Sequence, residues 1–180
     1  MRMRIKSTET TLLILGIYQI IGALLGFYLV AKILLNTQEI NGLLLLFFLV
    51  AIGLYSLSMK AGSVLIRKEY KRGLMLSIIN QFFQVIAIAI GGYKYDFFSG
   101  AKLSAGFNFT NGFHMKLESE LISEFGFSWN SGKEYYIYVN LLAIVLMYIF
   151  MGIYEEMFKK KKDKMTIENS ELFNITSNQE

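Results

Sequence analysis

The segment from Thr11 to Ala31 has the sequence TLLILGIYQIIGALLGFYLVA and contains no charged residue. Three further uncharged and mainly apolar runs of similar length follow at residues 40–59, 73–93 and 135–154. An α-helix rises 1.5 Å per residue, so a run of this length spans about 30 Å, the thickness of the hydrocarbon core of a bilayer. We therefore predict an all-α membrane protein, a bundle of four transmembrane helices at about 11–35, 40–59, 73–93 and 135–155.

The overall composition agrees with a membrane protein. Hydrophobic residues make up 54% of the chain and charged residues 18%, whereas soluble domains have about 45–50% and about 25%. The four runs contain no Asp, Glu, His, Lys or Arg, which argues against proton-coupled transport and voltage sensing. Cysteine is absent, which excludes disulfides and thiolate metal sites.

The distribution of basic residues predicts the orientation. Of the 18 Lys and Arg residues, 13 lie before the first run, between the second and third runs, or after the fourth. Because such residues are retained on the cytoplasmic side, we expect both termini in the cytoplasm and a multi-pass protein of the plasma membrane. Abundant Lys, Ile, Phe and Asn without Pro or Cys suggest a bacterial inner membrane.

The transmembrane domain is predicted to end near residue 158, and residues 159–180 to form a basic and then polar, disordered tail. We expect four consecutive lysines to contact anionic lipid headgroups: Lys159, Lys160, Lys161 and Lys162. The net charge of +4 is thus explained by membrane orientation, and no nucleic-acid partner is predicted.

The extracytoplasmic loop, residues 94–134, changes from continuous to alternating apolar positions. Asn111-Gly112 separates two alternating runs and is typical of a type I′ turn, so a β-hairpin is predicted at 102–121. Residues 124–129 repeat the alternation and provide a possible third strand. Residues 115–125 also fit an amphipathic helix, and we favour strands.

The small β-rich loop places apolar side chains on one face. This face can lie on the outer ends of the helices, join an interfacial aromatic belt, or bind another membrane or extracytoplasmic protein. The candidate partner-binding residues are Phe107, Phe109, Phe113, Met115, Leu117, Phe125, Phe127 and Trp129.

Two patterns within the runs bear on helix packing. An intramembrane polar cluster is predicted from Gln19, Asn80, Gln81 and Gln84. Hydrogen bonding between helices is the favoured explanation, and a polar transport pathway is the alternative. Gly22 and Gly26 form a GxxxG pattern that allows close helix packing within the bundle or in a dimer.

Candidate catalytic residues are sparse. His114, Lys116, Glu118 and Glu120 would project from one face of the second hairpin strand, although such alternation is usual for the solvated face of a sheet. With one histidine and no cysteine, no metal site or other cofactor is predicted.

No family motif is evident in the chain. The function that these patterns favour is a non-catalytic membrane subunit or accessory protein, which binds partners through its outer loop and helix faces. A small channel or transporter with an uncharged polar pathway is the alternative. A membrane enzyme with an outward-facing site ranks third.

Overall fold

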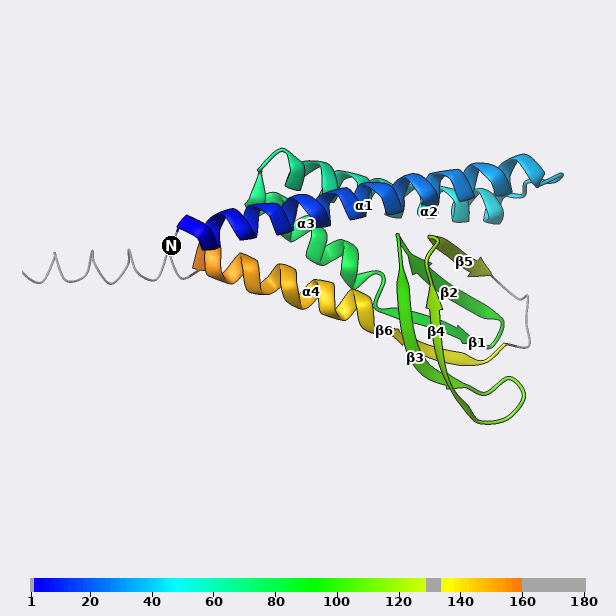
Figure 1. The fold of residues 1–180 in the computed structure, drawn as a ribbon. Coiled ribbons are helices and arrows are strands. Elements are labelled where there is room, and N and C mark those ends of the chain that lie inside the picture. The colour runs from blue at the N-terminus through cyan, green and yellow to red at the C-terminus, as the bar shows by residue number, and fades with distance from the viewer. Residues whose placement is uncertain (1, 129–133, 160–180) are drawn as a thin grey trace, which may run out of the picture.

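The computed structural model describes residues 2–128 and 134–159 of the 180-residue chain. Within these ranges the helices are α1 (Arg2–Asn36), α2 (Gly42–Ile66), α3 (Tyr70–Phe82) and α4 (Leu141–Tyr154), the last followed by a π-helical turn, η1 (Glu155–Lys159). Figure 1 shows the helices gathered at the end of the molecule that holds the N-terminus, with a curled sheet beside the far halves of α1 and α2.

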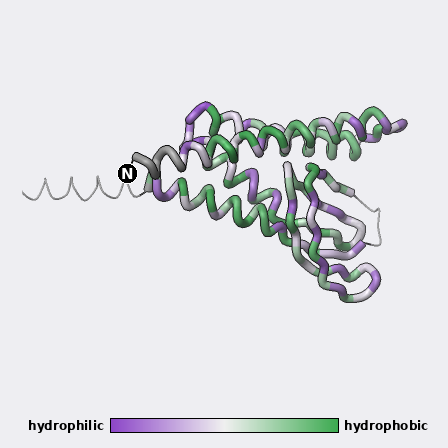
Figure 2. The backbone as a smooth tube through the Cα atoms, viewed as in Figure 1, coloured by the Kyte–Doolittle hydropathy of each residue, from purple (hydrophilic) through white to green (hydrophobic). Residues whose placement is uncertain are grey.

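Among the described residues, three helices are long and apolar enough to cross a membrane. They cover Thr8–Asn36, Gly42–Ile66 and Leu141–Phe158. Large apolar side chains are exposed along them, including Ile14 at 61% and Leu49 at 58%, and Figure 2 shows hydrophobic colour over their lengths. In water such surfaces would be unfavourable, so the three helices fit a membrane protein.

Helices α1 and α2 form an antiparallel pair held closely by glycine. The two helices approach closely at Gly16 and Gly62. A side-chain carbon added at Gly16 would lie 3.0 Å from the carbonyl oxygen of Gly62. A short link joins the pair, and the Asn41 side chain accepts a hydrogen bond of 2.8 Å from the Leu44 backbone to cap α2. Such capping satisfies an otherwise unpaired backbone donor.

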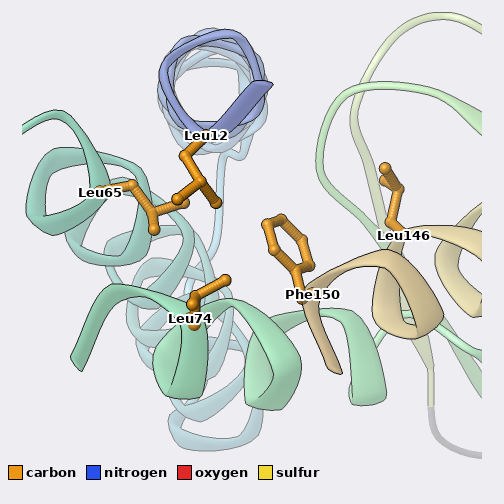
Figure 3. Packing of buried hydrophobic residues seen from close by; sticks show 5 residues of the cluster. All are labelled: Leu12, Leu65, Leu74, Leu146 and Phe150. Carbon is orange, nitrogen blue, oxygen red and sulfur yellow. The ribbon is translucent and has the colours of Figure 1, made fainter. Parts of the chain in front are cut away.

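An apolar cluster joins all four helices near the N-terminal end. Its buried members are Leu12, Leu65, Leu74, Leu146 and Phe150. Figure 3 shows Leu12, Leu65, Leu74 and Phe150 pointing toward one another from the four helices, with Leu146 farther along α4. This cluster fixes α3 and α4 against the α1–α2 pair.

The prediction of a four-transmembrane-helix bundle is wrong, because the third uncharged run is only partly helical. Helix α3 ends at Phe82, and Ile86–Ile90 forms strand β1. Its sequence, IAIAI, alternates with the period of a strand. Gly91 and Gly92, with φ of 60° and 88°, make a two-residue turn into β2 (Tyr93–Phe98).

The fourth run is divided in the same way. Tyr136–Asn140 forms strand β6, and α4 begins only at Leu141. The Asn140 side chain accepts a hydrogen bond of 3.3 Å from the Ala143 backbone, so this residue caps the helix at the junction. The expected small β-rich loop is therefore a larger sheet that includes the outer parts of both runs.

In the part of the chain that the structure describes, the sheet has six antiparallel strands in the order β4-β3-β6-β1-β2-β5. The remaining strands are β3 (Lys102–Asn108), β4 (His114–Glu120) and β5 (Glu124–Ser128). Within residues 115–125, the chain is therefore extended up to Glu120 rather than helical. The β3–β4 turn has positive φ at Gly112 (108°) and not at Asn111, so it is not a type I′ turn.

The two faces of the sheet are reversed relative to those of a soluble protein. Phe107 pairs with Met115 and Ala105 with Leu117 on the convex face, where Met115 is 76% exposed. The concave face carries small, polar and charged residues, several of them buried: Ala87, Ala89, Asp96, Lys102, Ser104 and Asn140. Polar-inside and apolar-outside sheets are characteristic of proteins whose strands face lipid.

Candidate binding site in the concave face of the sheet

The concave face encloses a polar cavity of ≈ 320 Å³, which we call the polar cup. Its acidic lining consists of Asp96, Glu118, Glu120, Glu124 and Glu134. Lys94, Lys116 and the rings of Tyr136 and Tyr138 also line it. Strand alternation places these side chains on one face, and the antiparallel register brings β2 through β6 around one space.

A buried ion pair lies at the base of the cup. The Lys102 Nζ is 2.8 Å from the Asp96 Oδ2 and 3.8 Å from a carboxylate oxygen of Glu120. The Asp96 residue is 6% exposed, and its Oδ1 has no hydrogen-bond partner. Burial raises the pKa of the Asp96 carboxyl, and the hydrogen bond and charge of Lys102 oppose that rise.

A pair of carboxyl groups, Glu120 of β4 and Glu124 of β5, also lies in the cup. Burial raises the pKa of Glu124, and a hydrogen bond with Glu120 raises it further. Two nearby carboxylates resist being ionised together, so such a pair holds a proton more tightly than an isolated carboxyl. This pair can bind a cation or exchange a proton.

The other lysines of the cup already have acidic partners. Lys116 pairs with Glu118 at 2.5 Å, and Lys94 lies 3.7 Å from Glu134. The Lys94 ammonium also lies 5.9 Å from the centre of the Tyr136 ring, which stacks on Tyr138 at 4.8 Å. Within residues 2–128 and 134–159, no group of three or more His, Cys, Asp or Glu residues has the arrangement of a metal site.

A second cavity adjoins the cup. This apolar groove, ≈ 520 Å³, is lined by Leu29 and Ile33 of α1, by Leu121 and Ile122 of the β4–β5 connection and by Phe125 of β5. Glu120 and Glu124 line both the groove and the polar cup. The carboxyl groups of Glu120 and Glu124 therefore lie where the apolar groove along α1 meets the polar cup.

Hydrogen bonds from Ser123 fix the β4–β5 connection to α1. Its hydroxyl donates to the Gly22 carbonyl over 2.7 Å and accepts from the Gly100 backbone over 2.8 Å. A side chain at Gly22 would overlap Ser99 and Gly100, and one at Gly26 would overlap the Tyr55 ring. Both glycines of the GxxxG pattern thus lie at contacts within one chain.

The predicted intramembrane polar residues are all buried, and three of them enter one hydrogen-bond network. The Gln19 amide donates to Ser77 over 2.9 Å, and Asn80 donates to Gln19 and to Ser58 over 3.4 and 3.2 Å. Gln84 donates to the Asn80 carbonyl and accepts from the Ser99 backbone over 2.9 Å. The Gln81 Nε2 has no partner.

The predicted partner-binding residues do not form one surface. Phe107, Met115 and Leu117 are exposed on the convex face, and Phe109 and Phe113 are exposed beyond the ends of the strands. Phe125 and Phe127 instead face the helices, with the Phe127 ring 4.2 Å from Phe47. Trp129 and the lysines Lys160, Lys161 and Lys162 lie outside the described residues, as does the Lys159 side chain.

The candidate catalytic residues share a face, as alternation predicted: His114, Lys116, Glu118 and Glu120 pair with Asn108, Gly106, Ser104 and Lys102. Of the four candidates, Lys116, Glu118 and Glu120 line the polar cup. Asp96, Lys102 and Glu124 were not predicted from the sequence as site residues. Each is a charged residue at an alternating position of a strand, but only strand pairing shows that they converge.

Comparisons of the chain with protein-family models, curated proteins and solved structures found no match.

Proposed function

We propose that this chain is a non-catalytic membrane accessory protein that holds its curled sheet within the outer half of the bilayer and offers the polar cup as a binding site. Both termini would face the cytoplasm, and the membrane would be the plasma membrane of a bacterium. The observation that carries the proposal is the contact between the sheet and the apolar part of α2.

The depth of the sheet follows from that contact. Phe97 of β2 packs in one cluster with Phe48, Ala51 and Tyr55 of α2, and all three α2 residues belong to the uncharged run 40–59. A helix of 25 residues extends about 37 Å, little more than the hydrocarbon core of about 30 Å. If α2 crosses the bilayer, the sheet beside it must lie largely at membrane depth.

The reversed faces of the sheet support the same depth. On the convex face, Ile86, Ile90 and Leu103 are 51%, 47% and 40% exposed. Lipid acyl chains stabilise such a surface, whereas water does not. Tyr93, which begins β2, and Tyr135, which precedes β6, are 52% and 44% exposed, as expected for side chains at a membrane interface.

In each of the two divided runs, a strand and a helix together are long enough to cross the bilayer. Helix α3 has 13 residues, about 20 Å, and β1 adds five residues of about 3.3 Å each. The same holds for β6 and α4. The inner strands β3, β6, β1 and β2 are paired on both sides within the sheet, as hydrocarbon requires of main-chain polar groups, whereas the edge strands β4 and β5 are each paired on one side.

Single-cysteine labelling tests this placement, because the chain has no native cysteine. We expect Ile86→Cys to resist a membrane-impermeant maleimide added to intact cells, and Asn111→Cys, beside the polar cup, to react. Lys68→Cys, in the α2–α3 link, should react only after permeabilisation. Reaction of Ile86→Cys at the rate of Asn111→Cys would overturn the proposal, and both should react fully after denaturation.

A membrane enzyme is a second candidate, favoured by the Glu120–Glu124 pair. A carboxyl group with a raised pKa beside a second carboxyl is suited to acid–base chemistry. Exchange of Glu124 for Gln would abolish turnover in an enzyme of this kind. The non-catalytic proposal predicts instead that the same exchange changes only binding.

A further inference from the structure

We propose that the polar cup and the apolar groove together bind one phospholipid whose headgroup carries a primary amine, with the ammonium at Glu120 and Glu124 and an acyl chain along α1. This inference rests on the proposed function, since it requires the sheet to lie at lipid depth.

The connection between the two cavities defines an amphiphilic ligand. Glu120 and Glu124 line both of them, so a molecule at these residues has polar space on one side and apolar space on the other. The groove runs against Leu29 and Ile33 of α1, within the span Thr8–Asn36. At the groove, Leu121 and Ile122 are 82% and 68% exposed, which an acyl chain would cover.

The charges of the cup favour a cation at this junction. The two lysines that line the cup pair with other carboxylates, Lys116 with Glu118 and Lys94 with Glu134. The buried Lys102 pairs most closely with Asp96, at 2.8 Å. In the part of the chain that the structure describes, no lysine lies within ion-pair distance of Glu124. The nearest approach to Glu120 is 3.8 Å.

An unpartnered buried atom points to a hydrogen-bond donor in the ligand. Asp96 lines the cup, and its Oδ1 atom is buried and accepts no hydrogen bond. A buried acceptor without a partner is unfavourable. A primary ammonium group has three donors, enough to serve Glu124, Glu120 and one further acceptor.

The same cup can accommodate the phosphate beside the amine. The side chains of Lys94 and Lys116 are 31% and 55% exposed, and both line the cavity. A lysine ammonium binds phosphate oxygens as a compact charge. A zwitterionic headgroup therefore matches the mixed lining better than an anionic headgroup does.

Calorimetric titration of the purified full chain in dodecyl maltoside tests the ligand class with three probes. Dihexanoylphosphatidylethanolamine has amine and chains, dihexanoylphosphatidylglycerol lacks the amine, and ethanolamine lacks the chains. We expect saturable binding of the first and at least about tenfold weaker binding of the other two, from a lost charged hydrogen bond or lost apolar contact. Equal affinity for the two phospholipids, or no saturable binding, would overturn the inference.

Two variants locate the site. Glu124→Gln keeps the shape and removes the charge, so binding of the ethanolamine lipid should weaken about tenfold to a hundredfold. Glu69→Gln is the matched control, because Glu69 lies in the α2–α3 link, away from both cavities, and pairs with Arg72, and it should bind as the unaltered protein does. An unchanged affinity in Glu124→Gln contradicts the assignment.

The outcomes separate this inference from the proposed function. If Glu124→Gln does not fold, the three probes on the unaltered protein still decide the ligand class. Absence of an amine preference, with Ile86→Cys protected in the bilayer, would reject the ligand and retain the membrane placement. Labelling of Ile86→Cys from water would reject both.

Discussion

The Lys102 ammonium lies 2.8 Å from the Asp96 carboxylate, and both side chains are buried at the base of the polar cup. The two residues flank a turn that is docked on α1. The Tyr18 hydroxyl accepts from the Ala101 backbone over 3.0 Å, and the Gly22 carbonyl accepts from Ser123. The ion pair therefore joins β2 to β3 at the point where the sheet meets the membrane helices.

Removal of Lys102 should destabilise the fold strongly. In Lys102→Met, Asp96 would be left as a buried charge without a partner, and such losses cost about 3–5 kcal/mol. Thermal unfolding in detergent measures the effect. The double variant Asp96→Asn with Lys102→Met should recover part of the stability, and Lys116→Met, which breaks an exposed pair, should change little. Equal stability of Lys102→Met and Lys116→Met would refute the role of the buried pair.

Stability should fall as pH rises. Burial and the hydrogen bond to Glu120 raise the pKa of Glu124 above its ordinary value of 4.5. A carboxyl with a raised pKa contributes stability that is fully present below the unfolded value and is lost as pH passes the folded value. Unfolding temperatures from about pH 4 to about pH 8 should therefore decline less steeply in Glu124→Gln than in the unaltered protein.

Asp96 should account for the decline of unfolding temperature with pH that remains in Glu124→Gln, because burial raises the pKa of Asp96 as well. Glu118→Gln serves as the control for an exchange elsewhere in the cup. A pH profile of Glu124→Gln that superimposes on that of the unaltered protein would show that Glu124 does not contribute.

The apolar runs could be predicted from the sequence, but their conformation was predicted only in part. Hydropathy measures whether a segment avoids water, and a strand that faces lipid avoids it as a helix does. In the third run the alternation of Ile86–Ile90 and the pair Gly91-Gly92 are hairpin signals. They were hidden because the length of the run matched one helical crossing.

Of the side chains on the concave face, only those of β4 could be predicted from alternation in the sequence to share a face. Lys116, Glu118 and Glu120 are two residues apart, so their common face follows from the period of a strand. Asp96 and Glu124 join them through the pairing of β2 with β5 and the curl of the sheet. That arrangement depends on contacts between distant segments, which local sequence patterns do not specify.

The contact of Gly26 with Tyr55 should not tolerate a side chain. An added carbon at Gly26 would overlap the Tyr55 ring, which is itself fully buried. We expect Gly26→Ala to cost about 1–3 kcal/mol, as overpacking does. Gly53→Ala is the control in a membrane helix, because no atom lies within 4 Å of the added carbon there. A similar unfolding temperature for both variants would contradict the close packing.

The intramembrane polar residues should differ in their effect on stability. Gln19→Leu removes the donor to Ser77 and the acceptor of Asn80, which leaves buried groups unpaired and should cost about 1–3 kcal/mol. Gln81→Leu removes a buried amide whose nitrogen has no partner, so stability should stay unchanged or rise. Thermal unfolding measures both variants.

The same two variants distinguish helix packing from a transport pathway. Purified protein in liposomes should show no solute flux that depends on Gln81, because Gln19 and Asn80 are occupied by each other and by neighbouring helices. A flux in the unaltered protein that Gln81→Leu abolishes, without loss of folded protein, would establish a pathway instead. With packing as the role, only Gln19→Leu lowers the yield of folded protein.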